Sequence, residues 1–252
     1  MKIVVVGGTG LVGTKVVHRL SEAGHDVLPA SPRTGVDTVT GRGLSDALRG
    51  ADVVVDVSNS PKLEDAEAMS FFRASTTNLL DAEDRSGVGH HVALSVVGTD
   101  RLAPQSGYFQ AKLLQESMIS SGPVPYTIVR ATQFFEFLAT IADSATDGDT
   151  VRLPQALIQP IASADVARGV AITATGDPVN GITEIGGPET SALDEVIRTA
   201  LTARGDRRQV IADASARYWG VDIDADTLIP SHAAMLFNTR LADWVLETAA
   251  KR

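Results

Sequence analysis

The stretch Lys2–Gly13, KIVVVGGTGLVG, constrains the fold of this chain more than any other part of it. Residues 3–6 form a continuous β-branched run, which is typical of a strand that is buried on both faces of a parallel sheet. Gly7, Gly10 and Gly13 then follow at regular intervals. From Leu11 onward the apolar residues recur with the period of a helix. The stretch therefore predicts a strand, a glycine-rich turn and a helix in direct succession.

Each glycine of this turn has a geometric reason to be there. Gly7 permits a tight exit from the strand, Gly10 lets a pyrophosphate approach the backbone, and Gly13 lets the helix pack closely on the sheet. The free N–H groups and the positive dipole end of the helix would face that pyrophosphate. A glycine-rich turn that binds nothing is the alternative. We predict a dinucleotide site with these residues: Gly7, Thr9, Gly10, Leu11, Val12 and Gly13.

Further residues extend this pattern to a family of proteins. The turn GGTGLVG, together with Tyr108, Lys112 and the segment PYTIVRATQFFEF, resembles the atypical short-chain dehydrogenases/reductases, specifically their NmrA-like NAD(P)H-binding group. The likeness covers nearly the whole chain and is densest from Met1 to about Ala167. The resemblance implies an enzyme that binds a nicotinamide cofactor and acts on a small molecule.

Composition excludes several other classes. The net charge of -9 argues against a nucleic-acid-binding surface, because backbone phosphates would be repelled on average. With no cysteine there can be neither a disulfide framework nor a thiolate site. No apolar run reaches the length of a membrane span, and no signal peptide precedes the first strand, so we expect a cytoplasmic protein without a membrane partner. The sequence leaves the oligomeric state open.

Strand and helix patterns alternate along the first part of the chain. Strands are predicted at residues 26–30, 36–40, 52–57, 91–97 and 126–130, with helices at 44–48, 63–85, 107–120 and 134–145 between and after them. This alternation requires crossover connections, so we expect an α/β protein with a doubly wound, mostly parallel sheet, a Rossmann fold.

From about Asp147 the pattern becomes irregular, with a strand expected at 182–185 and helices at 193–204 and 241–250. No linker separates the two parts, so we expect one NAD(P)-binding domain over residues 1–252. The resemblance implies that its C-terminal part, about 147–252, forms a small lobe that caps the substrate.

The end of the second strand indicates which cofactor is bound. An acidic residue there would accept hydrogen bonds from the ribose hydroxyls of NAD and would repel a 2′-phosphate. This chain has Ser31 and Arg33 instead, and a hydroxyl and a guanidinium suit a phosphate. We predict NADP(H); an incidental arginine on a surface loop is the alternative.

Tyr108 and Lys112 form the predicted chemical centre. They are four residues apart on a predicted helix, so both side chains lie on one face. An ammonium about 4 Å from a phenol would lower the pKa of the phenol by up to roughly three units, which would make Tyr108 a usable acid and base. Ser95 lies on the preceding predicted strand. The plain alternatives are a strand end for Ser95, a helix cap for Tyr108 and a solvated charge for Lys112.

The resemblance implies a role for each residue of this centre. Ser95 would hydrogen-bond the substrate carbonyl, Tyr108 would pass the proton, and Lys112 would hold the nicotinamide ribose while lowering the pKa of Tyr108. The sequence thus favours an NADP(H)-dependent oxidoreductase that reduces a small carbonyl or quinone. Two alternatives stay open: a non-catalytic NADP(H) sensor of NmrA type, and a sugar-nucleotide epimerase or dehydratase whose diphosphate would need Arg204, Arg207, Arg208 and Arg217.

Aromatic and apolar residues in the second half suggest an apolar substrate pocket. The segment TQFFEF follows the last predicted strand of the alternating part, at the sheet edge where open α/β sheets bind ligands. The predicted pocket residues are Phe134, Phe135, Trp219, Met235 and Phe237. An equally good alternative is that they only attach the lobe to the sheet. No metal site is expected, because adjacent residues such as His90 and His91 point to opposite faces of a strand.

Overall fold

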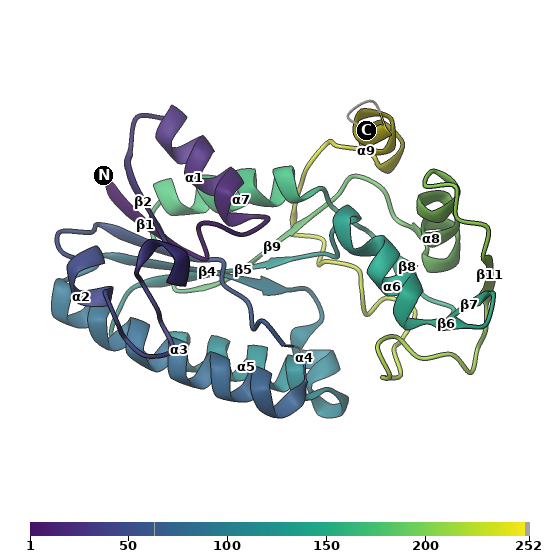
Figure 1. The fold of residues 1–252 in the computed structure, drawn as a ribbon, viewed down its shortest axis with the longest axis horizontal. Coiled ribbons are helices and arrows are strands. Elements are labelled where there is room, and N and C mark those ends of the chain that lie inside the picture. Colours follow the sequence, from purple (N-terminus) through teal and green to yellow (C-terminus); the bar gives the residue numbers. More distant parts are fainter. Residues whose placement is uncertain (63, 250–252) are drawn as a thin grey trace. The chain divides into compact units, whose positions relative to one another are not determined.

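The computed structural model of the protein describes residues 1–62 and 64–249 (Figure 1). Leu63 and Ala250, expected as helix ends, lie outside the described residues. The strands are β1 (Lys2–Val6), β2 (Asp26–Ala30), β3 (Val53–Asp56), β4 (His90–Val96), β5 (Tyr126–Ala131), β6 (Thr146–Asp147), β7 (Thr150–Leu153), β8 (Leu157–Ile158), β9 (Gly181–Gly186), β10 (Ser191–Ala192), β11 (Gln209–Ala212) and β12 (Met235–Leu236). The helices are α1 (Gly13–Glu22), α2 (Leu44–Ala47), α3 (Asp65–Ser86), α4 (Thr99–Leu102), α5 (Gly107–Ser120), α6 (Leu138–Ser144), α7 (Ser163–Thr175), α8 (Leu193–Thr202) and α9 (Leu241–Ala249), with 3-10 turns η1 (Pro32–Thr34), η2 (Ala103–Gln105) and η3 (Phe135–Phe137).

Seven of these strands form one sheet in the order β12-β9-β5-β4-β3-β1-β2. β1 pairs in parallel with both β2 and β3, β3 pairs in parallel with β4, and β9 pairs in parallel with β12. Parallel neighbours need crossover connections, and helices α1, α3 and α5 supply them. The predicted doubly wound, mostly parallel sheet is confirmed.

The chain divides into two compact units. Unit 1 comprises residues 1–95, 107–130 and 166–183, and unit 2 comprises residues 96–106, 131–165 and those from Glu184 onward. Each unit is therefore assembled from segments that are far apart in the sequence. The expected substrate lobe at about 147–252 stays a prediction, and unit 2 also takes in residues from before that boundary.

In unit 1 the sheet is covered by helices on both faces, with α3 and α5 on one face and α1 and α7 on the other (Figure 1). This explains the continuous apolar runs of β1 and β3, because every position of a central strand faces a helix. Val4 and Val6 pack in one buried cluster with Leu79 of α3. Phe72 of α3 is fully buried and packs against Ala111 of α5.

Unit 2 has its own core and smaller sheets. β11, β7 and β6 form a three-stranded sheet, and β10 pairs antiparallel with β8. The amphipathic helix α8 buries Leu193, Ile197 and Leu201 in a cluster with Leu138 of α6. This core is built largely by residues beyond Asp147, where the sequence pattern is irregular.

The strand expected at residues 36–40 is wrong. Only an isolated bridge joins Asp37 to Arg42, and the residues between them form turns. The reason is local: the Asp37 carboxylate accepts hydrogen bonds from the backbone N–H groups of Val39 and Thr40. A side chain that binds nearby backbone groups in this way competes with strand pairing.

Glu83 of α3 and His91 of β4 form a fully buried pair in unit 1. Oε1 of Glu83 lies 2.8 Å from Nδ1 of His91. Burial disfavours the charged imidazole, but the charge of Glu83 and its hydrogen bond outweigh burial and raise the pKa of His91. The neighbouring His90 instead meets the Thr127 hydroxyl at 3.0 Å, so the two histidines have different partners, as expected.

We predict that Glu83→Gln lowers the free energy of unfolding by about 3 kcal/mol at pH 6, the cost of removing one partner of a buried ion pair. A group whose pKa is raised by folding stabilises the protein fully when the pH is below the pKa of that group in the unfolded chain. This stabilisation is lost as the pH rises through the pKa of the group in the folded protein. The loss of unfolding free energy caused by Glu83→Gln should therefore be smaller at pH 10 than at pH 6. Urea unfolding followed by far-ultraviolet circular dichroism measures it, because both tryptophans, Trp219 and Trp244, lie in unit 2 and would not report on unit 1.

The matched control is Glu22→Gln. Glu22 faces His18 at 3.3 Å in the same kind of pair, but both side chains are largely exposed. We expect this change to cost less than about 1 kcal/mol at either pH. Equal losses for Glu83→Gln at pH 6 and pH 10 would show that His91 carries no charge in the folded protein.

Candidate functional site

The glycine-rich turn joins β1 to α1 in unit 1. Gly7 has a φ of +76°, and its N–H donates to the carbonyl of Ala30 at the end of β2 at 2.9 Å. The N–H of Gly10 donates back to the carbonyl of Gly7 at 2.9 Å, and that of Thr14 donates to Gly10 at 3.1 Å. The helix begins at Gly13, two residues later than the pattern predicts, so Leu11 belongs to the turn.

Close contacts explain why these positions are glycine. A Cβ atom at Gly13 would lie 2.1 Å from the carbonyl oxygen of Gly7, and one at Gly7 would lie 2.9 Å from the backbone of Ser58. Gly8, which the sequence pattern does not single out, is equally restricted, since its Cβ would lie 2.7 Å from the carbonyl oxygen of Val5. At Gly10 the nearest atom would be 3.2 Å away. Gly7, Gly8 and Gly13 thus serve packing within the chain, whereas Gly10 lies on the exposed side of the turn.

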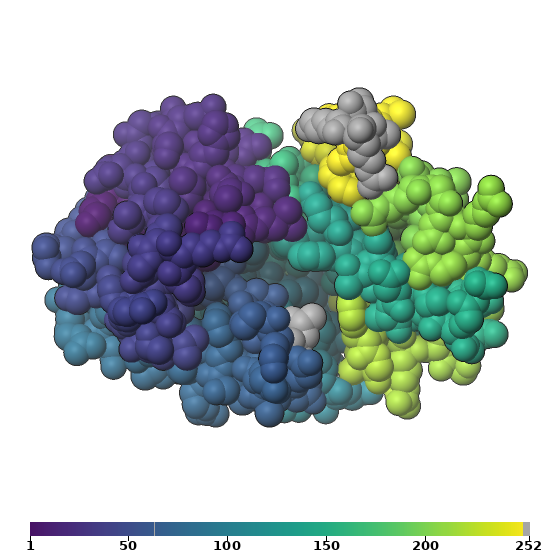
Figure 2. Space-filling model, in the orientation of Figure 1, coloured from purple at the N-terminus to yellow at the C-terminus, as the bar shows by residue number. Residues whose placement is uncertain are grey.

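The start of α1 presents unpaired backbone donors. The N–H groups of Leu11, Val12 and Gly13 donate to no atom in the described part of the chain. No acidic residue lies in the first turn of α1, so the positive end of the helix dipole is not neutralised there. Figure 2 shows the N-terminal segment, in purple, over a wide part of the surface of unit 1, and Thr9 and Leu11 are exposed. This arrangement fits a bound phosphate or pyrophosphate.

Ser31 and Arg33 follow β2 and differ in how they are held. Ser31 is buried, and its N–H donates to the hydroxyl of Thr34 at 2.9 Å, so it organises the η1 turn. Arg33 is exposed and has no hydrogen bond or ion pair with the described residues. Its guanidinium therefore keeps all its donors for an anion.

The structure brings Tyr108 and Lys112 together on α5, with Phe72 of α3 between them. The ring centroids of Tyr108 and Phe72 are 6.2 Å apart, and Nζ of Lys112 lies 4.7 Å from the Phe72 centroid. The phenol of Tyr108 donates to Oδ1 of Asn59 at 3.1 Å. The predicted pair thus shares one face of α5, but the two polar groups have different partners.

The structure contradicts the expected effect of Lys112 on Tyr108. Burial raises the pKa of Tyr108 to about 12, and the hydrogen bond to Asn59 offsets only part of this rise. Lys112 is not among the groups that shift it. The physical reason is that the ammonium group of Lys112 points to other partners, so Tyr108 stays a neutral phenol at neutral pH.

The amino group of Lys112 is buried. It donates to the carbonyl of Leu94 in β4 at 2.9 Å and to Oε1 of Gln115 at 2.5 Å. Burial lowers the pKa of Lys112 to about 8, and the negative charges of Asp56 and Glu116 oppose this fall. At neutral pH the group is mostly charged, so it provides a fixed positive charge beside Tyr108.

Ser95 lies on β4, as predicted, but its hydroxyl faces α5. It donates to Oε1 of Glu116 at 2.5 Å, and Arg130 of β5 donates to both oxygens of the same carboxylate, at 3.0 and 2.7 Å. All three residues are buried. The structure therefore joins Ser95 to Glu116 and not to Tyr108.

Comparison with known proteins decides the family. Residues 7–178 match the family model described as NAD(P)H-binding. The chain belongs to the NAD(P)H-binding family. This agrees with the free donors at the start of α1, and it confirms the resemblance drawn from the glycine turn.

A relative among characterised proteins is a reductase. The chain is 28% identical over 242 residues to the (4-alkanoyl-5-oxo-2,5-dihydrofuran-3-yl)methyl phosphate reductase of Streptomyces griseus, with 88% of this chain and 78% of the relative covered.

Two solved structures are similar in fold. The dTDP-4-dehydrorhamnose reductase of Bacillus anthracis in complex with NADP has a TM-score of 0.73 and 13% identity, covering 100% of this chain and 99% of its own. The UDP-glucose 4-epimerase of Thermus thermophilus in complex with NAD has a TM-score of 0.68 and 18% identity, covering 91% and 92% of the two chains. Both bear on the fold alone.

Several polar residues of this NAD(P)H-binding protein were not predicted as part of its site. Asn59 binds Tyr108, Gln115 binds Lys112, and Asp56 receives a hydrogen bond from Gln115 at 3.0 Å. One signal was present in the sequence: Gln115 and Glu116 follow Lys112 by three and four residues, so α5 places three polar side chains on one buried face. Nothing in the sequence marks Asn59 as their neighbour.

The predicted substrate residues all belong to unit 2 but do not gather at one point. Phe134 stacks on Phe137, with 5.5 Å between ring centroids. Phe237 is buried, whereas Trp219 and Met235 are 42% and 47% exposed. Phe135 is buried against Trp244, with 5.6 Å between centroids. Of these five residues, Phe135 alone lines the pocket of unit 2.

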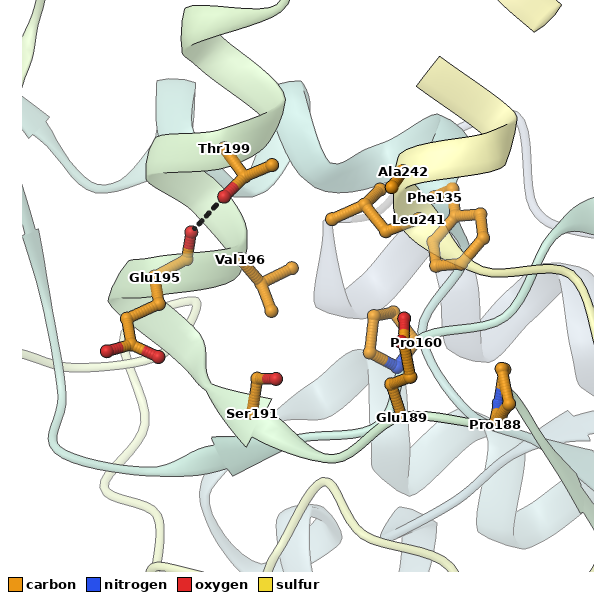
Figure 3. A pocket seen from close by; sticks show the side chains of 10 residues that line it. All are labelled: Phe135, Pro160, Pro188, Glu189, Ser191, Glu195, Val196, Thr199, Leu241 and Ala242. Carbon is orange, nitrogen blue, oxygen red and sulfur yellow. Dashed lines mark hydrogen bonds between the residues drawn. The ribbon is translucent and has the colours of Figure 1, made fainter. Parts of the chain in front are cut away.

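Unit 2 contains a pocket of about 240 Å3. Phe135, Val196 of α8 and Leu241 of α9 surround its centre, and the carboxylate of Glu195 points away from it (Figure 3). The remaining lining residues are Pro160, Pro188, Glu189, Ser191, Thr199 and Ala242. The pocket is apolar at its centre, and Phe135 is the one predicted substrate residue that lines it.

The described residues contain no helix long and apolar enough to span a bilayer. They also contain no group of three or more histidine and acidic side chains placed to hold a metal ion.

Proposed function

We propose that this protein is an NADP(H)-dependent reductase that acts on a small carbonyl compound, quinone or related electrophile. The observation that carries the proposal is the placement of Tyr108: a partly buried phenol on α5 that is neutral at neutral pH, with the buried Lys112 on the same face of the helix. A non-catalytic sensor would not need a proton donor held in this way.

The residues of unit 1 have separate roles in the proposed reaction. The N–H groups of residues 11–13 would hold the nicotinamide cofactor at the glycine turn, and the cofactor would supply a hydride there. Tyr108 donates its proton to the oxygen that gains negative charge in the reduction. Lys112, which does not shift the pKa of Tyr108, would hold the nicotinamide ribose with its amino group, on the same face of α5. Ser95 donates to Glu116, so we assign the proton to Tyr108 alone.

The substrate class rests on the relative and on unit 2. The Streptomyces griseus reductase is named for a substrate with an alkanoyl group, a ring oxo group and a phosphate ester. An acylated lactone of this kind is an electrophile in the proposed class. We propose that unit 2 provides an apolar pocket for such a compound, and Phe135 is the predicted substrate residue that lines it.

Two of the four arginines that the epimerase alternative would need are engaged in ion pairs within unit 2. Arg208 is held by Asp206 at 2.7 Å and by Asp143 at 2.9 Å, and Arg217 lies 3.2 Å from Asp222. Arginines that are already paired with carboxylates are poor candidates for binding the diphosphate of a sugar nucleotide. The side chains of Arg204 and Arg207 are exposed and have no hydrogen bond or ion pair with the described residues, so they remain available to an anion.

The direct test is a substrate comparison with NADPH. We expect oxidation of NADPH, followed at 340 nm, with quinones, aryl ketones or acylated unsaturated lactones, with and without a phosphate ester. UDP-glucose and dTDP-linked sugars should neither be converted nor bind in a saturable way. The reason is the apolar centre of the unit 2 pocket and the ion pairs that already engage Arg208 and Arg217.

Two outcomes would contradict the proposal. Saturable binding of a sugar nucleotide, with the apolar electrophiles inert, would favour the epimerase. Tight binding of NADPH without oxidation by any compound of the panel would favour the sensor.

Tyr108→Phe should lower turnover by about a hundredfold or more while leaving the affinity for NADPH nearly unchanged, because it removes the proton and keeps the ring against Phe72. Steady-state kinetics and a fluorescence titration with NADPH measure the two effects. Tyr126→Phe is a matched control, since Tyr126 lies on β5 and has no proposed role. Full turnover by Tyr108→Phe would exclude Tyr108 as the proton donor.

Arg33→Ala should weaken the binding of NADPH by about 1.5 to 3 kcal/mol, the worth of a charged hydrogen bond, and should leave NADH nearly unaffected. The reason is that the free guanidinium of Arg33 lies after β2, where the adenosine ribose binds in this fold. Dissociation constants for both cofactors, with Arg19→Ala on the exposed side of α1 as control, test this. Equal affinities of the unaltered protein for NADPH and NADH would refute the preference.

A further inference from the structure

Lys112 is surrounded by four elements of unit 1. The carbonyl of Leu94 in β4 and the amide of Gln115 in α5 accept its hydrogen bonds, and the ring of Phe72 in α3 lies beneath it. The charged groups that act on it are the carboxylates of Asp56 in β3 and Glu116 in α5. Of these, only Gln115 contacts both the lysine and a carboxylate of another element.

Gln115 is 1% exposed, and both ends of its amide are engaged. Oε1 accepts from Nζ of Lys112 at 2.5 Å, and Nε2 donates to Oδ2 of Asp56 at 3.0 Å. An amide is well suited to this position, because its oxygen faces a cation while its NH2 group faces an anion. A carboxylate there would repel Asp56, and an apolar side chain would leave both charges without this partner.

The chain of contacts continues to the glycine turn. Oδ1 of Asp56 accepts from the N–H and the hydroxyl of Ser58, at 2.9 and 2.6 Å. The backbone of Ser58 is the group that leaves no room for a Cβ atom at Gly7. Hydrogen bonds and close packing thus connect Lys112, through Gln115 and Asp56, to the turn that holds the cofactor.

We propose that Gln115 is a positioning residue: its amide fixes the amino group of Lys112 and links it, through Asp56, to the nucleotide-binding turn. The significance of this link for catalysis rests on the role proposed above for Lys112. Gln115 itself touches neither cofactor nor substrate in this assignment. Its effect is on the place and the protonation of the lysine.

The test is the pKa of Lys112, measured by NMR on protein labelled with 13C at the lysine Cε. The chain has five lysines, and the signal of Lys112 is the one that Lys112→Met removes. In the unaltered protein it should titrate at about 8. In Gln115→Met the pKa should be lower by roughly one, because a hydrogen bond to the charged form is lost. Gln110→Met, the same substitution at an exposed position of α5, should leave it unchanged.

A second measurement uses the reaction. The substrate is one that the NADPH assay identifies. As the pH rises and Lys112 loses its proton, kcat/KM should fall. In Gln115→Met this fall should begin at a lower pH, by the same amount as the change in the pKa of Lys112. If Gln115→Met does not fold, Gln115→Asn replaces it, because the shorter amide cannot reach both partners.

The outcomes separate the two proposals. An unchanged Lys112 pKa in the Gln115 variant would overturn the positioning role, whatever the activity of the protein. A lowered pKa in a protein that reduces no compound of the panel would support the positioning role and contradict the proposed function.

Discussion

The close approach between the end of β1 and the start of α1 is the constraint on which the cofactor site depends. The carbonyl of Gly7 occupies the space that any side chain at Gly13 would need, and the backbone of Ser58 occupies the space beside Gly7. Only with glycine at both positions can α1 begin so close to the sheet. Its first N–H groups then stay unpaired at the carboxyl edge of the sheet, which is the edge where open α/β sheets bind their ligands.

The fold was predictable wherever burial dictates the sequence. Central strands such as β1 and β3 contain continuous apolar runs because helices cover both faces, and this pattern can be recognised from the sequence alone. Residues 36–40 have apolar positions too, but Asp37 binds the backbone of the next residues and no strand forms. The division of the chain into units was not predictable, because each unit is joined from distant segments and only contacts between them define it.

For the candidate site residues, the sequence predicted their positions in the fold better than their interactions. The spacing of Tyr108 and Lys112 places them on one face of α5, as expected. The partners that decide their chemistry come from elsewhere: Asn59 lies 49 residues before Tyr108 in the sequence, and Leu94 and Phe72 reach Lys112 from other elements. A pattern within one helix contains no information about these contacts. For this reason the direction of the pKa shift of Tyr108 was wrong although the residue was correctly placed.

The burial of the charged Lys112 lowers the stability of the fold. A lysine whose pKa falls from 10.5 to about 8 on folding binds fewer protons in the native state between these values, so stability rises with pH across this range. At neutral pH the buried charge therefore costs about 3 kcal/mol relative to an unperturbed lysine. A side chain kept for stability alone would be apolar here, next to Phe72 and Ala111. That the helix instead buries Lys112, Gln115 and Glu116 side by side is the strongest physical argument that this face of α5 serves chemistry and not only packing.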